Sequence, residues 1–121
     1  MIRTLATGTI AALLVGGAAF AQAPVVYTWT GYGVNVPGSS KCPTYKMSIE
    51  VAVAGKAVKG TFQQEGRDQR HFEATLNDKG LFKTKAQVSS GTMDVSGVIS
   101  DKESKVLLDG YCKFEGKLTK K

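Results

Sequence analysis

Apolar and polar residues alternate along most of the chain after residue 24. This alternation predicts β-strands that bury one face. The clearest run covers residues 45–53, where odd positions are apolar and even positions are Lys46, Ser48, Glu50 and Ala52. Comparable segments, separated by turn-forming residues, cover residues 25–32, 57–63, 70–76, 81–88, 92–99, 105–109 and 111–118. No segment shows the periodicity of an amphipathic helix, so we predict an all-β chain.

The order of these segments predicts an antiparallel meander of seven or eight strands. Gly110 leaves open whether residues 105–118 form one bent strand or two. We expect the meander to close into a small up-and-down barrel, because closure removes exposed strand edges. A β-sandwich is the alternative. Residues 33–44 form the one long connection, and we expect it to cross one end of the barrel.

Five of the segments carry a small residue between two larger ones on the predicted buried face. Gly60, Gly97 and Gly116 are the clearest of these small positions. They indicate either bend points that let the strands curve or the lining of a cavity for an apolar ligand. We favour bend points, because the phenylalanines of the same strands can fill the interior of so small a domain.

The first 21 residues have the three parts of a secretory signal peptide. Arg3 precedes an uncharged, largely apolar stretch, and Ala19-Phe20-Ala21 has the small-x-small form of a cleavage site. We expect cleavage after Ala21, which leaves residues 22–121 as a single β-barrel domain. The apolar centre is shorter than the roughly 20 residues of a membrane-spanning helix, so we expect no transmembrane segment after cleavage. These features predict export to the periplasm or the extracellular space.

The cysteine content agrees with export. Cys42 and Cys112 are the only two cysteines, and both follow the predicted cleavage site. An even number of cysteines in an oxidising compartment predicts a disulfide between them. One His and two Cys are too few for a zinc site built from these residues alone, so we expect neither a metal nor a cofactor.

No catalytic arrangement can be assembled from the chain. His71 is out of phase with the apolar residues of its strand, so we expect it to point to solvent. The carboxylates Glu50, Glu73, Asp94 and Glu115 also take outward positions, which argues against a buried acid pair. No Gly-x-Ser-x-Gly motif is present. We therefore predict that the protein is not an enzyme.

The charge balance points to anionic partners. The 121 residues include 16 Lys and Arg against 10 Asp and Glu, which gives a formal net charge of +6. We do not expect nucleic acid as a partner, because the compartment is wrong and aromatic residues do not interleave with the lysines. Residue type and strand phase select six candidate ligand-binding residues, with stacking aromatics and charged lysines: Tyr27, Trp29, Tyr32, Lys41, Lys83 and Lys85.

Together these features predict a non-enzymatic, exported binding protein of the cell envelope. Its ligand would be a small amphipathic or anionic molecule, or an anionic envelope polymer. The alternative is a protein-binding inhibitor of an envelope hydrolase, or a structural accessory, acting through residues 33–44. A disulfide at Cys42 would order this loop in advance and lower the entropy cost of binding a protein partner. The outward lysines also have a simpler explanation, since they improve solubility and prevent edge-to-edge pairing.

Overall fold

The structure is a computed structural model of the chain, and it describes residues 23–34, 41–89 and 91–121. The predicted signal peptide and residues 35–40 of the long connection lie outside these ranges. The described residues form strands and one short 3-10 helix, which in chain order are β2 (Val25–Tyr32), η2 (Cys42–Thr44), β3 (Lys46–Ala54), β4 (Ala57–Gln64), β5 (Arg70–Thr75), β6 (Leu81–Val88), β7 (Gly91–Ile99), β8 (Ser104–Asp109), β9 (Lys113–Lys117) and β10 (Thr119–Lys120).

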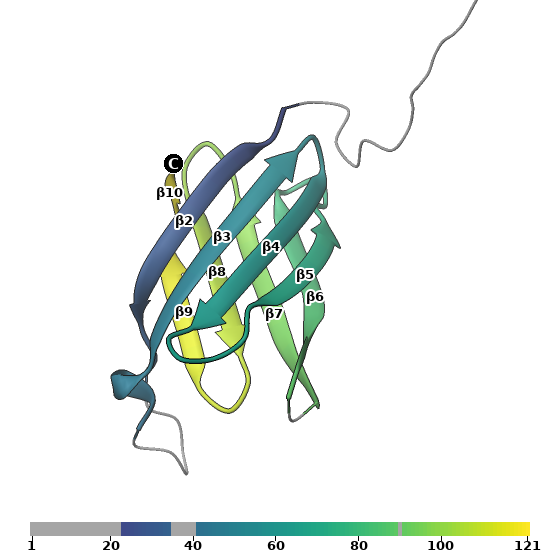
Figure 1. Cartoon of the computed structure of the whole chain (residues 1–121). Helices are drawn as coiled ribbons and strands as arrows, with labels where there is room; N and C mark the ends of the chain where they lie inside the picture. Colours follow the sequence, from purple (N-terminus) through teal and green to yellow (C-terminus); the bar gives the residue numbers. More distant parts are fainter. Residues whose placement is uncertain (1–22, 35–40, 90) are drawn as a thin grey trace, which may run out of the picture.

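The strands form two antiparallel sheets that pack face to face (Figure 1). One sheet has the order β10-β2-β3-β4-β5, and the other has the order β6-β7-β8-β9. Neighbouring strands are consecutive along the chain, apart from β10, which pairs with β2 and brings the end of the chain beside the start of the domain. The all-β class and the antiparallel meander are therefore confirmed.

The prediction of a closed barrel is wrong, and the sandwich alternative is correct. β5 and β6 lie side by side, but they belong to different sheets. The rings of Phe72 and Phe82, on the inner faces of these two strands, stack with centroids 6.0 Å apart. Bulky rings stacked between the strands hold the two backbones in separate layers, so side-chain packing takes the place of a backbone ladder at this edge.

The end of the chain also differs from the prediction. Residues 105–118 do not form one bent strand, because residues 110–112 turn the chain between β8 and β9. Leu118 then separates β9 from β10, and the chain crosses here from one sheet to the other. The described residues therefore contain nine strands, one more than the upper limit of the prediction.

The core lies between the two sheets and follows the predicted alternation. Residues facing inward from both sheets are buried: Met47, Ile49, Val51, Val53, Val58, Phe62, Phe72, Phe82, Ala86, Val95, Val106, Leu108 and Phe114. The alternation predicted these positions because a strand with one buried face repeats every two residues.

The glycines of the inner face make room for aromatic rings. Gly60 lies directly opposite Phe72 in the register, and Gly97 lies directly opposite Phe82. A Cβ atom at either glycine would overlap the facing ring. Gly116 receives the indole of Trp29 in the same way. The interpretation of these glycines as the lining of an interior cavity is therefore wrong, because aromatic rings fill the space beside them on the inner face.

The predicted disulfide is confirmed. Cys42 and Cys112 are joined, with their Cα atoms 5.6 Å apart, and both side chains are buried. The bond ties η2 to the turn between β8 and β9. A disulfide of this kind is typical of proteins in oxidising, exported environments. Over the described ranges, the structure has no helix long and apolar enough to cross a membrane.

Candidate ligand-binding cleft

The predicted aromatic residues take two different positions. Tyr27 and Trp29 lie on the inner face of β2, where they are partly buried and pack against the core. The indole of Trp29 lies against Gly31 and Gly116. Tyr32, at the end of β2, is 56% exposed. The first two rings therefore fill the sandwich, and only Tyr32 is open to a partner from solution.

The predicted lysines also take two different positions, with Lys41 apart from Lys83 and Lys85. Lys41 is exposed beside η2, at the end of the sandwich that carries the disulfide. Lys83 and Lys85 lie on the outer face of β6, and Lys85 donates a hydrogen bond to Asp94 at 2.6 Å. The six predicted residues thus occupy the core, the disulfide end and an outer face, and the fold does not bring them together into one site.

A cleft of about 330 Å³ opens between the two sheets at the disulfide end. Its inner wall is apolar, since Met47, Phe62 and Phe114 are buried there and Met93 is partly buried. Its outer rim is polar and is formed mainly by Tyr45, Gln64, Arg67, Asp68, Arg70, Ser89 and Tyr111. The cleft therefore combines an apolar interior with a charged mouth.

Arg70 is a charged residue that lines the cleft from an inward position of its strand. It begins β5 directly opposite Phe62 and on the same face as Phe72, so it holds an inward position in the strand. Its guanidinium donates a hydrogen bond to Ser89 Oγ at 2.7 Å. Because Ser89 follows β6, this bond joins the two sheets at their open edge. Arg70 keeps further donors that a ligand can use.

The loop between β4 and β5 adds a second arginine, Arg67, to the residues that line the cleft. Two hydrogen bonds order this loop: Gln63 Nε2 donates to the carbonyl of Arg67, and the amide of Arg67 donates to the carbonyl of Gln64. Asp68 is the only carboxylate among the lining residues. Two guanidiniums against one carboxylate make the mouth positive, and guanidinium groups bind carboxylate or phosphate with two parallel hydrogen bonds.

Met47 and Met93 give the interior of the cleft an adaptable wall. Both line the cleft, and Met47 is buried in β3. Met93, in β7, is only partly buried and packs beside Gly110 at the β8–β9 turn. Because methionine has three rotatable bonds and a polarisable sulfur, it can adapt to apolar groups of different shapes.

Arg70 and Gln64 were not among the residues predicted for a site, although both carry a signal in the sequence. Each takes a strand position whose neighbours of the same phase are apolar, since Gln64 follows Phe62 and Arg70 precedes Phe72 by two residues. A polar residue in the apolar phase at a strand end is expected to face either the core or an opening into it. The structure shows that these two residues face an opening into the core, because β5 and β6 do not pair at this edge.

The described residues offer no arrangement for metal binding, since they contain no cluster of three His, Cys, Asp or Glu side chains that could hold an ion. His71 is exposed on the outer face of β5, opposite Thr61. Asp94 has a lowered pKa, caused by the hydrogen bond and the charge of Lys85, but it lies on an outer face and not in the cleft. The cleft therefore offers an apolar interior together with two arginines and one carboxylate at its mouth.

Comparison of the chain with protein-family models, with curated proteins and with solved structures found no match.

Proposed function

We propose that this protein is a non-enzymatic, exported binding protein of the cell envelope that holds a small amphipathic anion in the cleft. The observation that carries the proposal is Arg70, an inward-facing guanidinium placed at the edge of an apolar cleft. The anionic group would lie between Arg70 and Arg67. The apolar part would contact Met47, Phe62 and Met93.

The size and character of the cleft agree with such a ligand. Its volume of about 330 Å³ is near the lower end of the range for small-molecule sites, which starts at about 300 Å³. Each methylene group that the ligand buries contributes about 0.8 kcal/mol. A short alkyl chain with one anionic group would therefore use both parts of the cleft, whereas a large or strongly polar ligand would use only its rim.

The methionine methyl groups allow a direct test. We expect decanoate to shift the methyl resonances of Met47 and Met93 in protein labelled with ¹³C at methionine methyls. Decyltrimethylammonium, which has a chain of the same length and the opposite charge, should bind more weakly. Failure of decanoate to shift either methyl resonance would refute the proposed cleft.

Replacing Arg70 tests the role of its charge. Arg70→Gln should weaken decanoate binding about tenfold or more, because it removes hydrogen bonds to a charged group. Lys56→Gln is the matched control, since it removes one positive charge from the exposed β3–β4 turn. It should leave the affinity within twofold. Equal affinity of the Arg70 variant and the original protein would overturn the placement of the anionic group.

A second candidate function rests on exposed apolar side chains at the disulfide end of the sandwich, close to where the long connection begins and ends. Tyr32, Val34 and Tyr111 are 56%, 50% and 72% exposed. Val34 pairs with Lys113, which places it beside the β8–β9 hairpin that contains Tyr111. These side chains favour the alternative of a protein-binding inhibitor of an envelope hydrolase. That function predicts that Tyr32→Ser/Val34→Ser, at two exposed positions outside the cleft lining, abolishes inhibition while decanoate still shifts the Met47 methyl resonance.

A further inference from the structure

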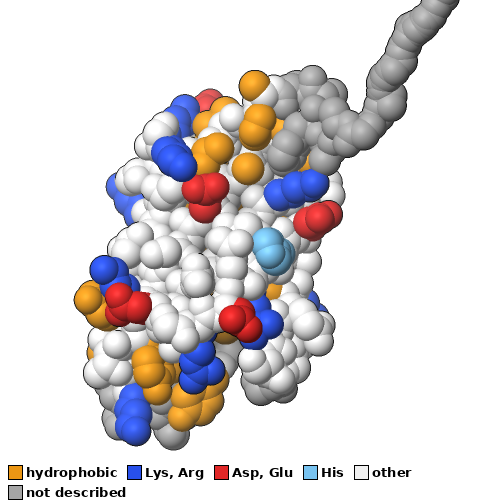
Figure 2. Space-filling model, in the orientation of Figure 1, with side chains coloured by type: hydrophobic (Ala, Val, Ile, Leu, Met, Phe, Trp, Pro, Cys, Tyr) orange, Lys and Arg blue, Asp and Glu red, His pale blue; other side chains and the backbone are white. Residues whose placement is uncertain are grey.

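The outer faces of the two sheets differ in character. Across the centre of the β2–β5 sheet, the outward positions are mostly small and polar, including Ser48, Thr61 and Gln63. Figure 2 shows this face, on which the centre is largely free of hydrophobic side chains. Its lysines, Lys46 and Lys59, are matched in number by carboxylates at Glu50 and Glu73.

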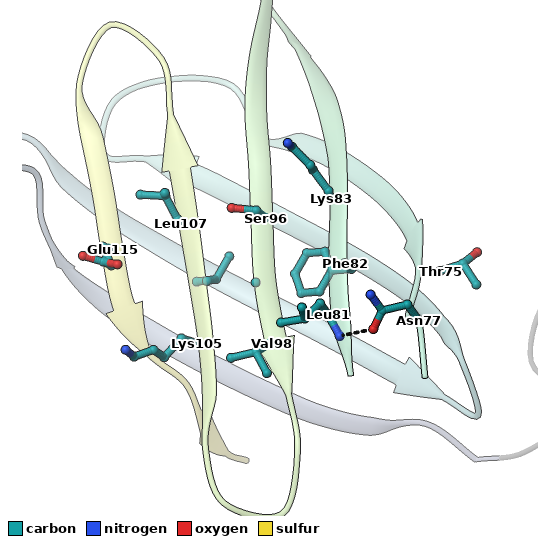
Figure 3. A pocket seen from close by; sticks show the side chains of 12 residues that line it. Thr75, Asn77, Leu81, Phe82, Lys83, Ser96, Val98, Lys105, Leu107 and Glu115 are labelled. Atoms are coloured by element: carbon teal, nitrogen blue, oxygen red, sulfur yellow. Dashed lines mark hydrogen bonds between the residues drawn. The ribbon is translucent and has the colours of Figure 1, made fainter. Parts of the chain in front are cut away.

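The outer face of the β6–β9 sheet carries an apolar strip instead. Leu81 lies opposite Val98 in the register, and Leu107 lies on the next strand beside Ser96. Leu81 is 45% exposed, and the other two side chains are partly exposed. Together they border a shallow hollow of about 650 Å³ (Figure 3). These three side chains are not part of the core, because other residues of the same strands fill the inner face.

Lysines surround this apolar strip. Lys83 and Lys105 line the hollow, and Lys117 lies directly opposite Lys105 on β9. Like charges at directly opposed positions of a sheet repel each other. Lys105 has only a distant ion pair, with its Nζ atom 3.8 Å from Glu103. An anion shared by Lys105 and Lys117 would relieve this repulsion.

The acidic residues of this face leave a positive excess. Five lysines stand on its outward positions against three carboxylates: Lys83, Lys85, Lys105, Lys113 and Lys117 against Asp94, Asp109 and Glu115. Asp94 is engaged by Lys85, and Asp109 lies opposite Lys113. Glu115 lines the hollow opposite Leu107. Lys83, Lys105 and Lys117 therefore supply the excess around the apolar strip.

We propose that the outer face of the β6–β9 sheet docks on a lipid bilayer that carries anionic, phosphate-bearing head groups. The lysines would contact the phosphates, and Leu81, Val98 and Leu107 would contact the apolar layer beneath them. An apolar strip bordered by cations is the arrangement expected of a surface that lies on an anionic membrane. A soluble polyanion would use the lysines and leave the apolar strip in water, so the strip favours the bilayer. This docking surface is separate from the cleft.

Vesicle binding tests the lysines. The exported form of the protein should co-sediment with vesicles of equimolar phosphatidylglycerol and phosphatidylcholine, and much less with vesicles of phosphatidylcholine alone. Each lysine near an anionic surface contributes about fivefold in affinity. Lys83→Gln/Lys117→Gln should therefore weaken binding about 25-fold. The matched control, Lys46→Gln/Lys59→Gln, removes the same charge from the opposite face and should change binding less than threefold.

A second variant tests the apolar strip and the source of the phosphate. Leu81→Ser should weaken binding to the mixed vesicles but not to soluble polyphosphate. All these side chains are on the surface, and unchanged thermal unfolding would show that the variants are folded. Equal losses in both lysine pairs, equally strong binding to vesicles of phosphatidylcholine alone, or unchanged vesicle binding by Leu81→Ser would each overturn the proposal. Loss of vesicle binding in Lys83→Gln/Lys117→Gln together with full vesicle binding by Leu81→Ser would replace the bilayer by a soluble polyanion that uses only the lysines.

Discussion

The ion pair between Lys85 and Asp94 changes the pKa of one residue on the outer face of the β6–β9 sheet. The two residues lie opposite each other on β6 and β7, with Lys85 Nζ 2.6 Å from the Asp94 carboxylate. The hydrogen bond from Lys85, followed by the charge of Lys85, lowers the pKa of Asp94 below its ordinary value of 3.8. Burial opposes this shift and the charge of Lys83 adds to it, both to a smaller extent.

This shift predicts a small pH dependence in acid. Because the pKa of Asp94 is lower in the folded protein, the pair stabilises the fold above the unfolded pKa. That contribution is lost as the pH falls below about 3.8 and through the folded pKa. Carboxyl-carbon NMR titration should show the lowered pKa, and Lys85→Gln should raise it towards the ordinary value. An identical titration of Asp94 in the Lys85→Gln variant would show that the ion pair is not the cause.

At the level of the strands, aromatic rings connect the two sheets where the backbone does not. The rings of Phe62, Phe72 and Phe82 come from β4, β5 and β6, with successive centroids 6.3 Å and 6.0 Å apart. Gly60 and Gly97 provide the space for two of these rings. The row of rings thus crosses the edge between β5 and β6, and we expect it to be sensitive to any added volume.

Adding one methyl group at Gly60 tests this packing. Gly60→Ala should lower the free energy of unfolding by about 1–3 kcal/mol, because the new Cβ overlaps the Phe72 ring and forces it to move. Urea unfolding measures the change. Thr61→Ala, on the outer face of the same strand, is the control and should change stability by about 0.5 kcal/mol or less.

A double-mutant cycle separates overpacking from a loss of strand propensity. If the ring is the cause, Phe72→Leu should cost less stability in the Gly60→Ala variant than in the original protein. Additive effects of the two substitutions would show that Gly60 and Phe72 are independent, and would contradict the proposed packing.

At the level of the whole molecule, local sequence patterns predicted the strands and their buried faces, but not whether the sheet closes into a barrel. The alternation in β3 and its neighbours identified the strands and their buried faces, because these depend on each strand's own residues. Whether β5 and β6 pair depends on how rings from different strands stack. The alternation within one strand does not predict this stacking. The barrel prediction failed at this point.

The same distinction explains the outcome for the candidate site. Tyr27 and Trp29 were selected by residue type, but the space that they fill is created by Gly116 and other residues distant in the sequence. The cleft exists because two sheets meet without closing, so its lining comes from six strands and from the turns between them. Arg70 and Gln64 did carry a local signal, as polar residues in the apolar phase of their strands.

The disulfide affects the stability of the whole chain. Cys42 and Cys112 are 70 residues apart, and a loop of this length restricts the unfolded chain strongly. In the chain-entropy model the bond contributes about 4 kcal/mol, which is a large share of the 5–15 kcal/mol typical of a folded domain. Cys42→Ser/Cys112→Ser should therefore lower the free energy of unfolding in urea by several kcal/mol. A loss below about 1 kcal/mol would contradict this model, and would mean that the two sheets are held together by their packing, with the bond needed only to position η2 beside the cleft.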